Sequence, residues 1–286
     1  MAFISIIIPT YNRSASLLRA IDSVHKNSES DIEIIVVDDG SNDGTTEEVK
    51  KLSDSRIRYH RQDNKGVCAA RNKGAELSGG QYLIFLDSDD EMMSGAIDSY
   101  REVIRKSLAD ILFADMMLLD GSNGKETFVS ARSPYGNVKS NGIFIPGTFC
   151  ISKKLFDKAG AYDNMMTYGE NTDLKFRVEK LKPSIAFVDT VAILYHQSID
   201  GGSKNIQNMV ASNKYMLEKH KDIFERFPAL EKKYRQTIAI AQCRMGEFTE
   251  AKRQMWSAYK CMPSDMKTLA RLILLSIPFV ARKIWH

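Results

Sequence analysis

The chain has 286 residues, of which 43% are hydrophobic, and it carries 40 Lys and Arg residues against 36 Asp and Glu residues. This composition supplies a core for one large α/β domain with an appendage, or for two modest domains, and excludes global disorder. The formal net charge of +4 is too small and too evenly spread to indicate a nucleic-acid partner.

Several other classes of protein are also excluded. Cys68, Cys150, Cys243 and Cys261 show neither a CxxC pair nor a histidine at ligand spacing, so we interpret them as reduced thiols of a cytoplasmic protein. The N-terminal MAFISIIIPTYNR lacks a basic segment and has a short apolar run, which predicts a strand and not a signal peptide. No stretch reaches about 18 uninterrupted apolar residues, so no membrane span is predicted.

The first ninety residues alternate between strand and helix patterns. The predicted strands are 3–9, 32–39, 56–60 and 82–87, and the predicted helices are 14–26 with Ser14 as its N-cap, a short helix around 49–52, and 67–77. Continuous apolar strands separated by helices predict a parallel sheet that is covered on both faces.

Beyond residue 110 the order of elements changes. We predict strands over 109–119 and 142–152, a helix over 171–180, and a last pair of strands within 184–196. From Gln207 onward the strand patterns disappear, which predicts two regions, an α/β domain over 1–205 and a helical region over 206–286. Residues 244–265 are similar to one tetratricopeptide-type helix pair, but a solenoid needs about three repeats, which favours an ordinary helical hairpin.

Acidic side chains follow two of the predicted strands. Asp38 and Asp39 end the second strand, and the stretch YLIFLDSDDE places Asp87–Asp90 after the fourth. Carboxyl ends of parallel strands meet at one edge of a sheet, where α/β proteins bind ligands. This edge also receives Pro9–Arg13. The alternative is a solvated turn, in which Ser94 starts the next helix.

The chemistry of these carboxylates favours a metal-bound phosphate ligand. Asp87 and Asp89 can present oxygens from one turn to Mg²⁺ or Mn²⁺, which would take one or two carboxylates together with phosphate oxygens and waters. A metal that bridges a diphosphate neutralises carboxylate and phosphate together. Asp38 or Asp39 could instead accept hydrogen bonds from a base or ribose, and Arg71 could contact the nucleotide or its phosphates.

Four segments, in their order and spacing, resemble the family 2 glycosyltransferases of the GT-A fold: IIIPTYNR, IIVVDDGSNDGT, NKGVCAARNKG and YLIFLDSDD. The resemblance covers about residues 3–200. It implies a Rossmann-like α/β domain with a mainly parallel central sheet. It also implies transfer of a hexosyl or N-acetylhexosaminyl group, with inversion, from a nucleotide-diphosphate donor to an acceptor hydroxyl; UDP is the default nucleotide.

The same resemblance assigns roles to individual residues. Thr10, Tyr11, Asp39 and Arg71 would line the nucleoside pocket, and the DSD of 87–89 would be the metal-binding DxD motif. The remaining donor-site candidates at this sheet edge are Pro9, Arg13, Asp38 and Ser88.

The segment GENTDLKFR (169–177) resembles the part of the family that supplies the catalytic base. The family often has Glu-Asp where this chain has Glu170 and Asn171, and an Asn side chain cannot take up a proton usefully. Glu170 is the first candidate for the base and Asp173, on the same helix face, is the second. The alternative is that both acids only favour a helix N-terminus through its dipole.

His196 lies in YHQSIDGGS, which loosely matches a family pattern of a His followed by a mobile Ser-rich loop. The resemblance implies that His196 completes the metal shell and that closure of the loop excludes water. Taken alone, a His at this position is more often packed or solvated.

The segment 268–286, TLARLILLSIPFVARKIWH, mixes apolar and basic residues. It is expected to lie at a membrane surface or, alternatively, to pack on the protein. A surface position would suit acceptors carried on lipids, as in bacterial polysaccharide assembly.

Two alternative functions remain open from the sequence. A Mg²⁺-dependent phosphatase or phospho-receiver would also use acidic strand ends, although no convincing Lys follows a later strand. A non-catalytic nucleotide-sugar-binding protein is suggested by Asn171.

Overall fold

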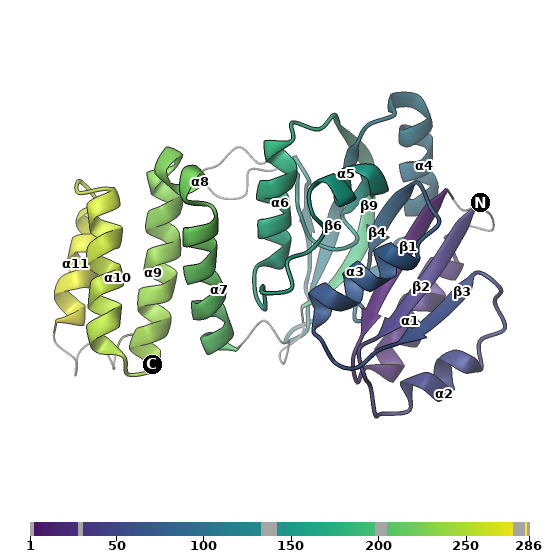
Figure 1. Cartoon of the computed structure of the whole chain (residues 1–286), viewed down its shortest axis with the longest axis horizontal. Coiled ribbons are helices and arrows are strands. Elements are labelled where there is room, and N and C mark those ends of the chain that lie inside the picture. Colours follow the sequence, from purple (N-terminus) through teal and green to yellow (C-terminus); the bar gives the residue numbers. More distant parts are fainter. Residues whose placement is uncertain (1–2, 28–30, 133–141, 198–204, 277–283, 285–286) are drawn as a thin grey trace. The chain divides into compact units, whose positions relative to one another are not determined.

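The structure is a computed structural model that describes residues 3–27, 31–132, 142–197, 205–276 and 284. The chain separates into two compact units (Figure 1). The first unit consists of residues 1–164 and 170–200, and the second consists of residues 165–169 and 201–286. The sequence did not predict that the short segment 165–169 belongs with the helical unit.

The first unit is built on one nine-stranded sheet. Its strands are β1 (Ile4–Thr10), β2 (Ile32–Asp38), β3 (Ile57–Arg61), β4 (Tyr82–Phe85), β5 (Glu91–Met92), β6 (Ile111–Asp120), β7 (Glu126–Val129), β8 (Phe149–Ser152) and β9 (Ile185–Gln197). The strand order is β3-β2-β1-β4-β8-β6-β9-β5, and β7 pairs with β6.

The strand directions change half-way across the sheet. The four strands β3, β2, β1 and β4 are parallel, as the sequence predicts. Beyond β4, however, β8 runs antiparallel to both of its neighbours, β5 runs antiparallel to β9, and only β6 and β9 are a parallel pair. The sheet is therefore mixed, and a mainly parallel description holds only for its first half.

Helices cover both faces of the sheet (Figure 1). They are α1 (Ser14–His25), α2 (Thr45–Lys50), α3 (Val67–Leu77), α4 (Ala96–Ser107), α5 (Lys153–Lys158) and α6 (Glu170–Lys180). Alternate residues of β1, such as Ile6 and Ile8, pack in one cluster with α1 and α4. Ile7 points to the opposite face, where a Cβ at Gly74 of α3 would come within 2.3 Å of its Cγ2. Strand alternation thus gives β1 a buried side chain on each face.

Several predicted boundaries were wrong. Residues 142–152 contain a strand only at Phe149–Ser152, because Thr148 Oγ1 donates to the carbonyl oxygens of Ile143 and Ile145, both at 2.8 Å, and holds a turn. The predicted strand pair in 184–196 is the single strand β9, whose pairing with β6 slips by two residues between Val188 and Val191.

Two helix starts also differ from the prediction. Ser14 is the first residue of α1 and not its N-cap, and its N–H donates to Asp43 Oδ2 at 3.0 Å. The helix expected to begin at Ser94 begins at Ala96, after Gly95 with a φ of +77°. A left-handed glycine costs little strain there, so the chain can turn sharply into α4.

The second unit is helical. Its helices are α7 (Ile206–Lys219), α8 (Lys221–Arg226), α9 (Pro228–Arg244), α10 (Phe248–Cys261) and α11 (Met266–Leu275). The predicted helix pair within 244–265 was wrong, because this stretch holds only α10 and the turn before it. The hairpin is formed by α9 and α10, which flank Gly246 at a φ of +80°. Its core contains Ala239, Ala251 and Met255, together with Leu275 of α11.

Candidate active site

The predicted site residues all belong to the first unit. Three groups lie at or just after the ends of the parallel strands β1, β2 and β4, and a fourth group lies in the first turn of α6. Of the other two residues, Arg71 lies on α3 and His196 lies near the end of β9. The register pairs Thr10 with Asp38 and Ile7 with Phe85, so the ends of these three strands are adjacent. The fold therefore brings together the acidic strand ends that the sequence singled out.

Asp38 is fully buried and holds the turn after β2. Its Oδ1 accepts from the N–H of Ser41 at 2.7 Å, and its Oδ2 accepts from the hydroxyl of Tyr59 at 2.5 Å. Burial, and then this bond to Asp38, raises the pKa of Tyr59 to about 12, which keeps the phenol protonated as a donor. Both carboxylate oxygens of Asp38 are thus committed within the protein.

Asp39 is also buried and organises the loop that leads into α3. Its Oδ1 accepts from Gln62 Nε2 at 2.7 Å and from the N–H of Lys65 at 2.9 Å, and its Oδ2 accepts from the N–H of Gly66 at 2.8 Å. Among the predicted nucleoside-pocket residues, Tyr11 is exposed, while Thr10 is buried with no described hydrogen bond at its Oγ1. Pro9, before Thr10, is the buried penultimate residue of β1.

Arg71 connects two parts of the site that are far apart in the sequence. Its buried guanidinium donates from Nη2 to Asp87 Oδ1 at 2.6 Å and from Nη1 to Glu170 Oε1 at 3.0 Å. The guanidinium carbon lies 5.1 Å from the ring centroid of Tyr162. Although burial by itself favours a neutral group, the adjacent carboxylates raise the pKa of Arg71 far above its ordinary value. The Arg71 guanidinium is therefore a permanent cation between the DSD loop and α6.

The two outer acids of the DSD loop are partly exposed, while Ser88 between them is buried. Asp87 pairs with Arg71, and Asp89 forms an ion pair with Arg13. The side chains of Asp87 and Asp89 are 28% and 25% exposed. Both carboxylates are thus paired with arginines and still reach solvent, and carboxylate oxygens are the ligand type that hard cations take.

Asp90 differs from its neighbours because it is buried. Its Oδ1 accepts from the N–H of His196 at 2.8 Å. Burial and then the negative charge of Asp87 raise the pKa of Asp90 to about 9, so this carboxyl is protonated at neutral pH. Asp90 therefore fastens the end of β9 to the DSD loop.

His196 lies against Glu91 in this structure. Its Nε2 is 2.8 Å from Glu91 Oε1, which also pairs with Arg19 Nε at 2.9 Å. Among the residues that the structure describes, no three His, Cys, Asp or Glu side chains are grouped as a complete metal site. Arg19 and Glu91 could not be predicted from the sequence, because no spacing rule links α1 to β5 and β9.

The two candidate bases have different surroundings. The side chain of Glu170 is 15% exposed, and its Oε1 accepts from Arg71 and from Asn171 Nδ2, each at 3.0 Å. Asp173 is fully buried, and its Oδ2 accepts from Arg177 Nε at 2.9 Å and Nη2 at 2.7 Å. The first turn of α6 thus presents Glu170 at the site and turns Asp173 into the core.

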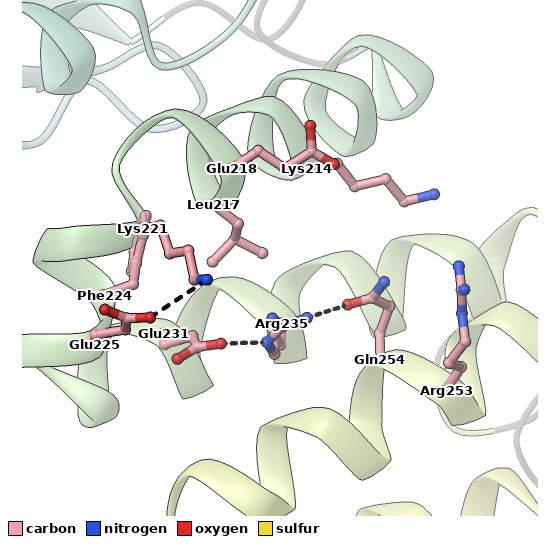
Figure 2. Close-up of a pocket in the computed structure, with 10 residues that line it drawn as sticks. All are labelled: Lys214, Leu217, Glu218, Lys221, Phe224, Glu225, Glu231, Arg235, Arg253 and Gln254. Carbon is pink, nitrogen blue, oxygen red and sulfur yellow. Dashed lines mark hydrogen bonds and ion pairs between the residues drawn. The ribbon is translucent and has the colours of Figure 1, made fainter.

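The helical unit contains a separate pocket of about 490 Å³ (Figure 2). Its walls carry acids and bases in pairs, such as Lys221 with Glu225 at 3.6 Å and Arg235 with Glu231 at 2.7 Å. Arg235 also donates to Gln254 at 3.2 Å. The lining of this pocket therefore mixes acids and bases, whereas the strand ends of the first unit gather acids.

Comparison with known families decides the family of this chain. The model of the family described as "Glycosyl transferase family 2" matches residues 5–162. This stretch includes Arg71 and the ends of β1, β2 and β4, with the DSD loop. The chain is a family 2 glycosyltransferase by sequence. The resemblance read from the four motifs is thereby confirmed at the level of the family.

Named relatives of this family 2 member come from several bacteria. The Streptococcus pneumoniae glycosyltransferase GlyG is 28% identical over 68% of this chain and 70% of its own length. A Campylobacter jejuni GalNAc(5)-diNAcBac-PP-undecaprenol beta-1,3-glucosyltransferase is 35% identical over 44% of this chain. That match covers only 42% of the Campylobacter protein.

A solved structure supports the fold. Staphylococcus aureus TarS, residues 1–349, in complex with UDP-GlcNAc aligns with a TM-score of 0.65 at 17% identity, over 98% of this chain and 88% of that one. The first unit therefore has the expected GT-A-like α/β fold, with a curled mixed sheet, and the helices follow it in the chain.

Proposed function

We propose that the protein is an inverting glycosyltransferase that moves a sugar from a UDP-sugar to an acceptor hydroxyl. The observation that carries the proposal is the pair of bonds from Arg71 to Asp87 and to Glu170. These bonds join the predicted diphosphate end of the site to the predicted base. The transferred sugar, a hexosyl or N-acetylhexosaminyl group, would bind between the diphosphate end of the site and the base.

Asp87 and Asp89 would hold the divalent metal, Mn²⁺ or Mg²⁺. Two partly exposed carboxylates fit such an ion when a diphosphate and waters supply the other oxygens, and His196 is a further candidate ligand. When bound, the metal stabilises the negative charge of the departing diphosphate. Arg13, which pairs with Asp89, is placed to contact phosphate oxygens.

The remaining donor-site residues would bind the nucleoside. Tyr11 is exposed next to the end of β1, and its ring can stack on a nucleobase. The buried Thr10 hydroxyl has no described hydrogen-bond partner and can donate to the nucleoside. Asp38 and Asp39 would act through the loops that they hold, and Ser88 is buried between the two outer acids of the DSD loop. Glu170 would accept the proton of the acceptor hydroxyl as this oxygen attacks the sugar carbon.

The alternative of a phosphatase or phospho-receiver is weakened by the same geometry. Such enzymes need an accessible nucleophilic aspartate, whereas Asp38 and Asp39 are buried with their oxygens hydrogen-bonded. The partly exposed Asp87 and Asp89 are each paired with an arginine. The alternative of a non-catalytic nucleotide-sugar-binding protein rests on Asn171, and only a turnover measurement separates it from the proposal.

Binding of nucleotide diphosphates with and without Mn²⁺ tests the proposal. We expect UDP with Mn²⁺ to raise the melting temperature more than GDP or dTDP does. At a hundred times its Kd, a ligand stabilises a protein by about 2.7 kcal/mol, which is several degrees for a chain of this size. The same samples are then assayed for UDP release from UDP-glucose and UDP-N-acetylglucosamine.

The possible results separate the candidate functions. No stabilisation by any nucleotide would contradict the proposal. Stabilisation without UDP release, also in the presence of acceptors, would identify a binding protein.

Lipid-linked saccharides are the acceptors that we propose. The Campylobacter relative is named for an undecaprenol diphosphate substrate, as is an Escherichia coli relative, WfgD, that is 30% identical over 45% of this chain. No helix in the described part of the chain is long and apolar enough to cross a membrane. Because lipid-linked acceptors lie at a membrane surface, we propose that the protein acts in the cytoplasm, with peripheral contact to the inner face of the membrane.

Charge supports this contact more strongly than the overall composition indicated. Residues 201–286 carry 16 Lys and Arg residues against 7 Asp and Glu residues, a net charge of +9, while residues 1–200 carry a net charge of −5. The prediction of an evenly spread charge was therefore wrong, because the positive charge is concentrated in residues 201–286. The exposed side chains of α10 and α11 include Trp256, Met266 and Ile273, which suit a membrane interface.

Only part of the predicted membrane segment 268–286 is free for this role. Thr268 and Leu275 of α11 are buried, so α11 packs on the helical unit. Residues 277–283 and 285–286 lie outside the described part of the chain.

We expect the variant with Lys260→Glu and Lys267→Glu to sediment at least tenfold less with phosphatidylglycerol vesicles. Both lysines are exposed, and each basic residue near an anionic surface contributes about 1 kcal/mol. The matched control reverses Lys50 and Lys154, exposed lysines of the first unit. If both double variants sediment as the native protein does, the helical unit is not a membrane contact.

A further inference from the structure

Asn171 stands where the family often has an aspartate, and its amide is held from both sides. The hydroxyl of Tyr162 donates to Asn171 Oδ1 at 3.0 Å, and Asn171 Nδ2 donates to Glu170 Oε1 at 3.0 Å. Because Oδ1 faces a phenol and Nδ2 faces a carboxylate, this orientation of the amide satisfies both neighbours.

Tyr162 is a rigid support for this amide. Its ring is buried and packs edge-on against Phe85, with 5.2 Å between centroids, and in a tilted arrangement against Phe156, with 5.8 Å between centroids. The Arg71 guanidinium lies over the same ring. Burial raises the pKa of Tyr162 well above its ordinary range, so its hydroxyl stays protonated and can donate. The aromatic core thus fixes the position of Asn171.

Glu170 receives both of its donors on one oxygen. Arg71 Nη1 and Asn171 Nδ2 each donate to Oε1, and no residue that the structure describes donates to Oε2. A carboxylate bonded in this way has a fixed rotamer and keeps one oxygen for another partner. Arg71 comes from α3, Asn171 from α6, and Tyr162, which donates to Asn171, from the loop before α6. The arrangement therefore depends on the tertiary fold and not on one helix alone.

From this geometry we infer that Asn171 is a positioning residue, which together with Arg71 orients Glu170 so that its Oε2 faces the acceptor. The inference rests on the proposed function, since it assumes that Glu170 is the base. An aspartate at 171 would have no proton to donate and would place a second negative charge next to Glu170. In this chain, therefore, the amide is required, and Asn171 is not a degenerate base.

The decisive variant is Asn171→Asp, which restores the residue that the family often has. Because the acceptor is unidentified, the assay measures UDP release from UDP-glucose and UDP-N-acetylglucosamine with Mn²⁺ and water as acceptor. We expect kcat to fall at least tenfold, since small displacements of a catalytic group cost up to about a hundredfold. KM for the donor should change less than threefold.

Two further readouts separate positioning from a merely structural role. In Asn171→Asp, the acid limb of the pH–rate profile should move to higher pH, because a neighbouring negative charge favours the protonated carboxyl. Asn171→Gln retains an amide donor and should recover part of the rate that Asn171→Ala loses. Asn208→Asp, which adds a carboxylate to the first turn of α7, is the matched control and should leave kcat unchanged.

Each outcome decides between the claims. A faster Asn171→Asp enzyme would overturn the inference and make residue 171 a lost base. Native kcat in Asn171→Ala, with Glu170→Gln inactive, would overturn the positioning role and leave the proposed function intact. Unchanged UDP release in Glu170→Gln would refute the base, and the inference with it. If Asn171→Asp does not fold, Asn171→Ala and Asn171→Gln decide the question.

Discussion

Replacing Glu170 with Gln is expected to lower the rate of sugar transfer, and of UDP release to water, by about 10²–10⁴-fold. Gln keeps the size of the side chain and can still accept from Arg71 and Asn171 through its carbonyl oxygen. It cannot take up the proton of an acceptor hydroxyl. Affinity for UDP and Mn²⁺ should therefore stay within about threefold of the native value, because the loss is confined to the chemical step.

Asp173→Asn is the matched variant, since it also changes one carboxylate of the same helix turn to an amide. Asp173 is fully buried and carries two hydrogen bonds from Arg177. Removing its charge leaves the guanidinium poorly paired and should lower the free energy of unfolding by about 2–3 kcal/mol. Per folded molecule, its rate should stay near the native value.

The comparison is made with transfer rate, UDP affinity and melting temperature measured on both variants. A collapse of transfer in Asp173→Asn, with binding and melting temperature intact, would exchange the two roles. Native rates in both variants would place the base elsewhere on the protein.

The first half of the fold is the part that the sequence predicts well. The β-branched runs Ile6–Ile8 and Ile34–Val37 lie within buried parallel strands, and near-continuous apolar sequence is typical of strands that are covered on both faces. The position of the acids at the strand ends follows from the same pattern. The convergence of Asp38 and Asp87 at one edge of the sheet was therefore predictable from the sequence, whereas the bonds from Arg71 to Asp87 and Glu170 were not.

The second half was harder to predict because its pairings are non-local. Asp110 and Ser184 connect the starts of β6 and β9 across 74 residues, and β8 inserts between β4 and β6 in the reverse direction. An antiparallel insertion gives no periodic signal that differs from that of a parallel strand. The irregularity in β9 around Asp189 likewise interrupts its pattern and imitates the turn between two strands.

The sequence also does not predict where each acidic side chain of the site points. Spacing places Glu170 and Asp173 on one helix face, but it does not say that Arg177, one turn further on, would bind Asp173 in the core. Similarly, two adjacent acids at 38 and 39 look alike in sequence, whereas each serves a different loop in the structure. Such assignments depend on which distant hydrogen-bond donors the fold brings near.

Asp89→Ala is expected to abolish the Mn²⁺-dependent part of the stabilisation by UDP. Asp89 is one of only two acids that the DSD loop exposes, and a metal with so few protein ligands depends on each of them. At a hundred times the native Kd, the stabilisation lost is about 2.7 kcal/mol. The melting temperature without ligand should hardly change, because the partner Arg13 is also exposed and such ion pairs contribute about 0–1 kcal/mol.

Asp22→Ala is the control for this measurement, since Asp22 is a second exposed acid of the first unit and pairs with Lys26 at 2.5 Å. Its response to UDP and Mn²⁺ should equal that of the native protein. Persistence of the metal-dependent shift in Asp89→Ala would show that the diphosphate binds without this carboxylate. A loss of UDP binding in both the presence and the absence of Mn²⁺ would instead assign Asp89 to the nucleotide. A selective loss of the metal effect would assign the two partly exposed acids at the tip of this apolar strand to metal binding, beyond their ion pairs with Arg71 and Arg13.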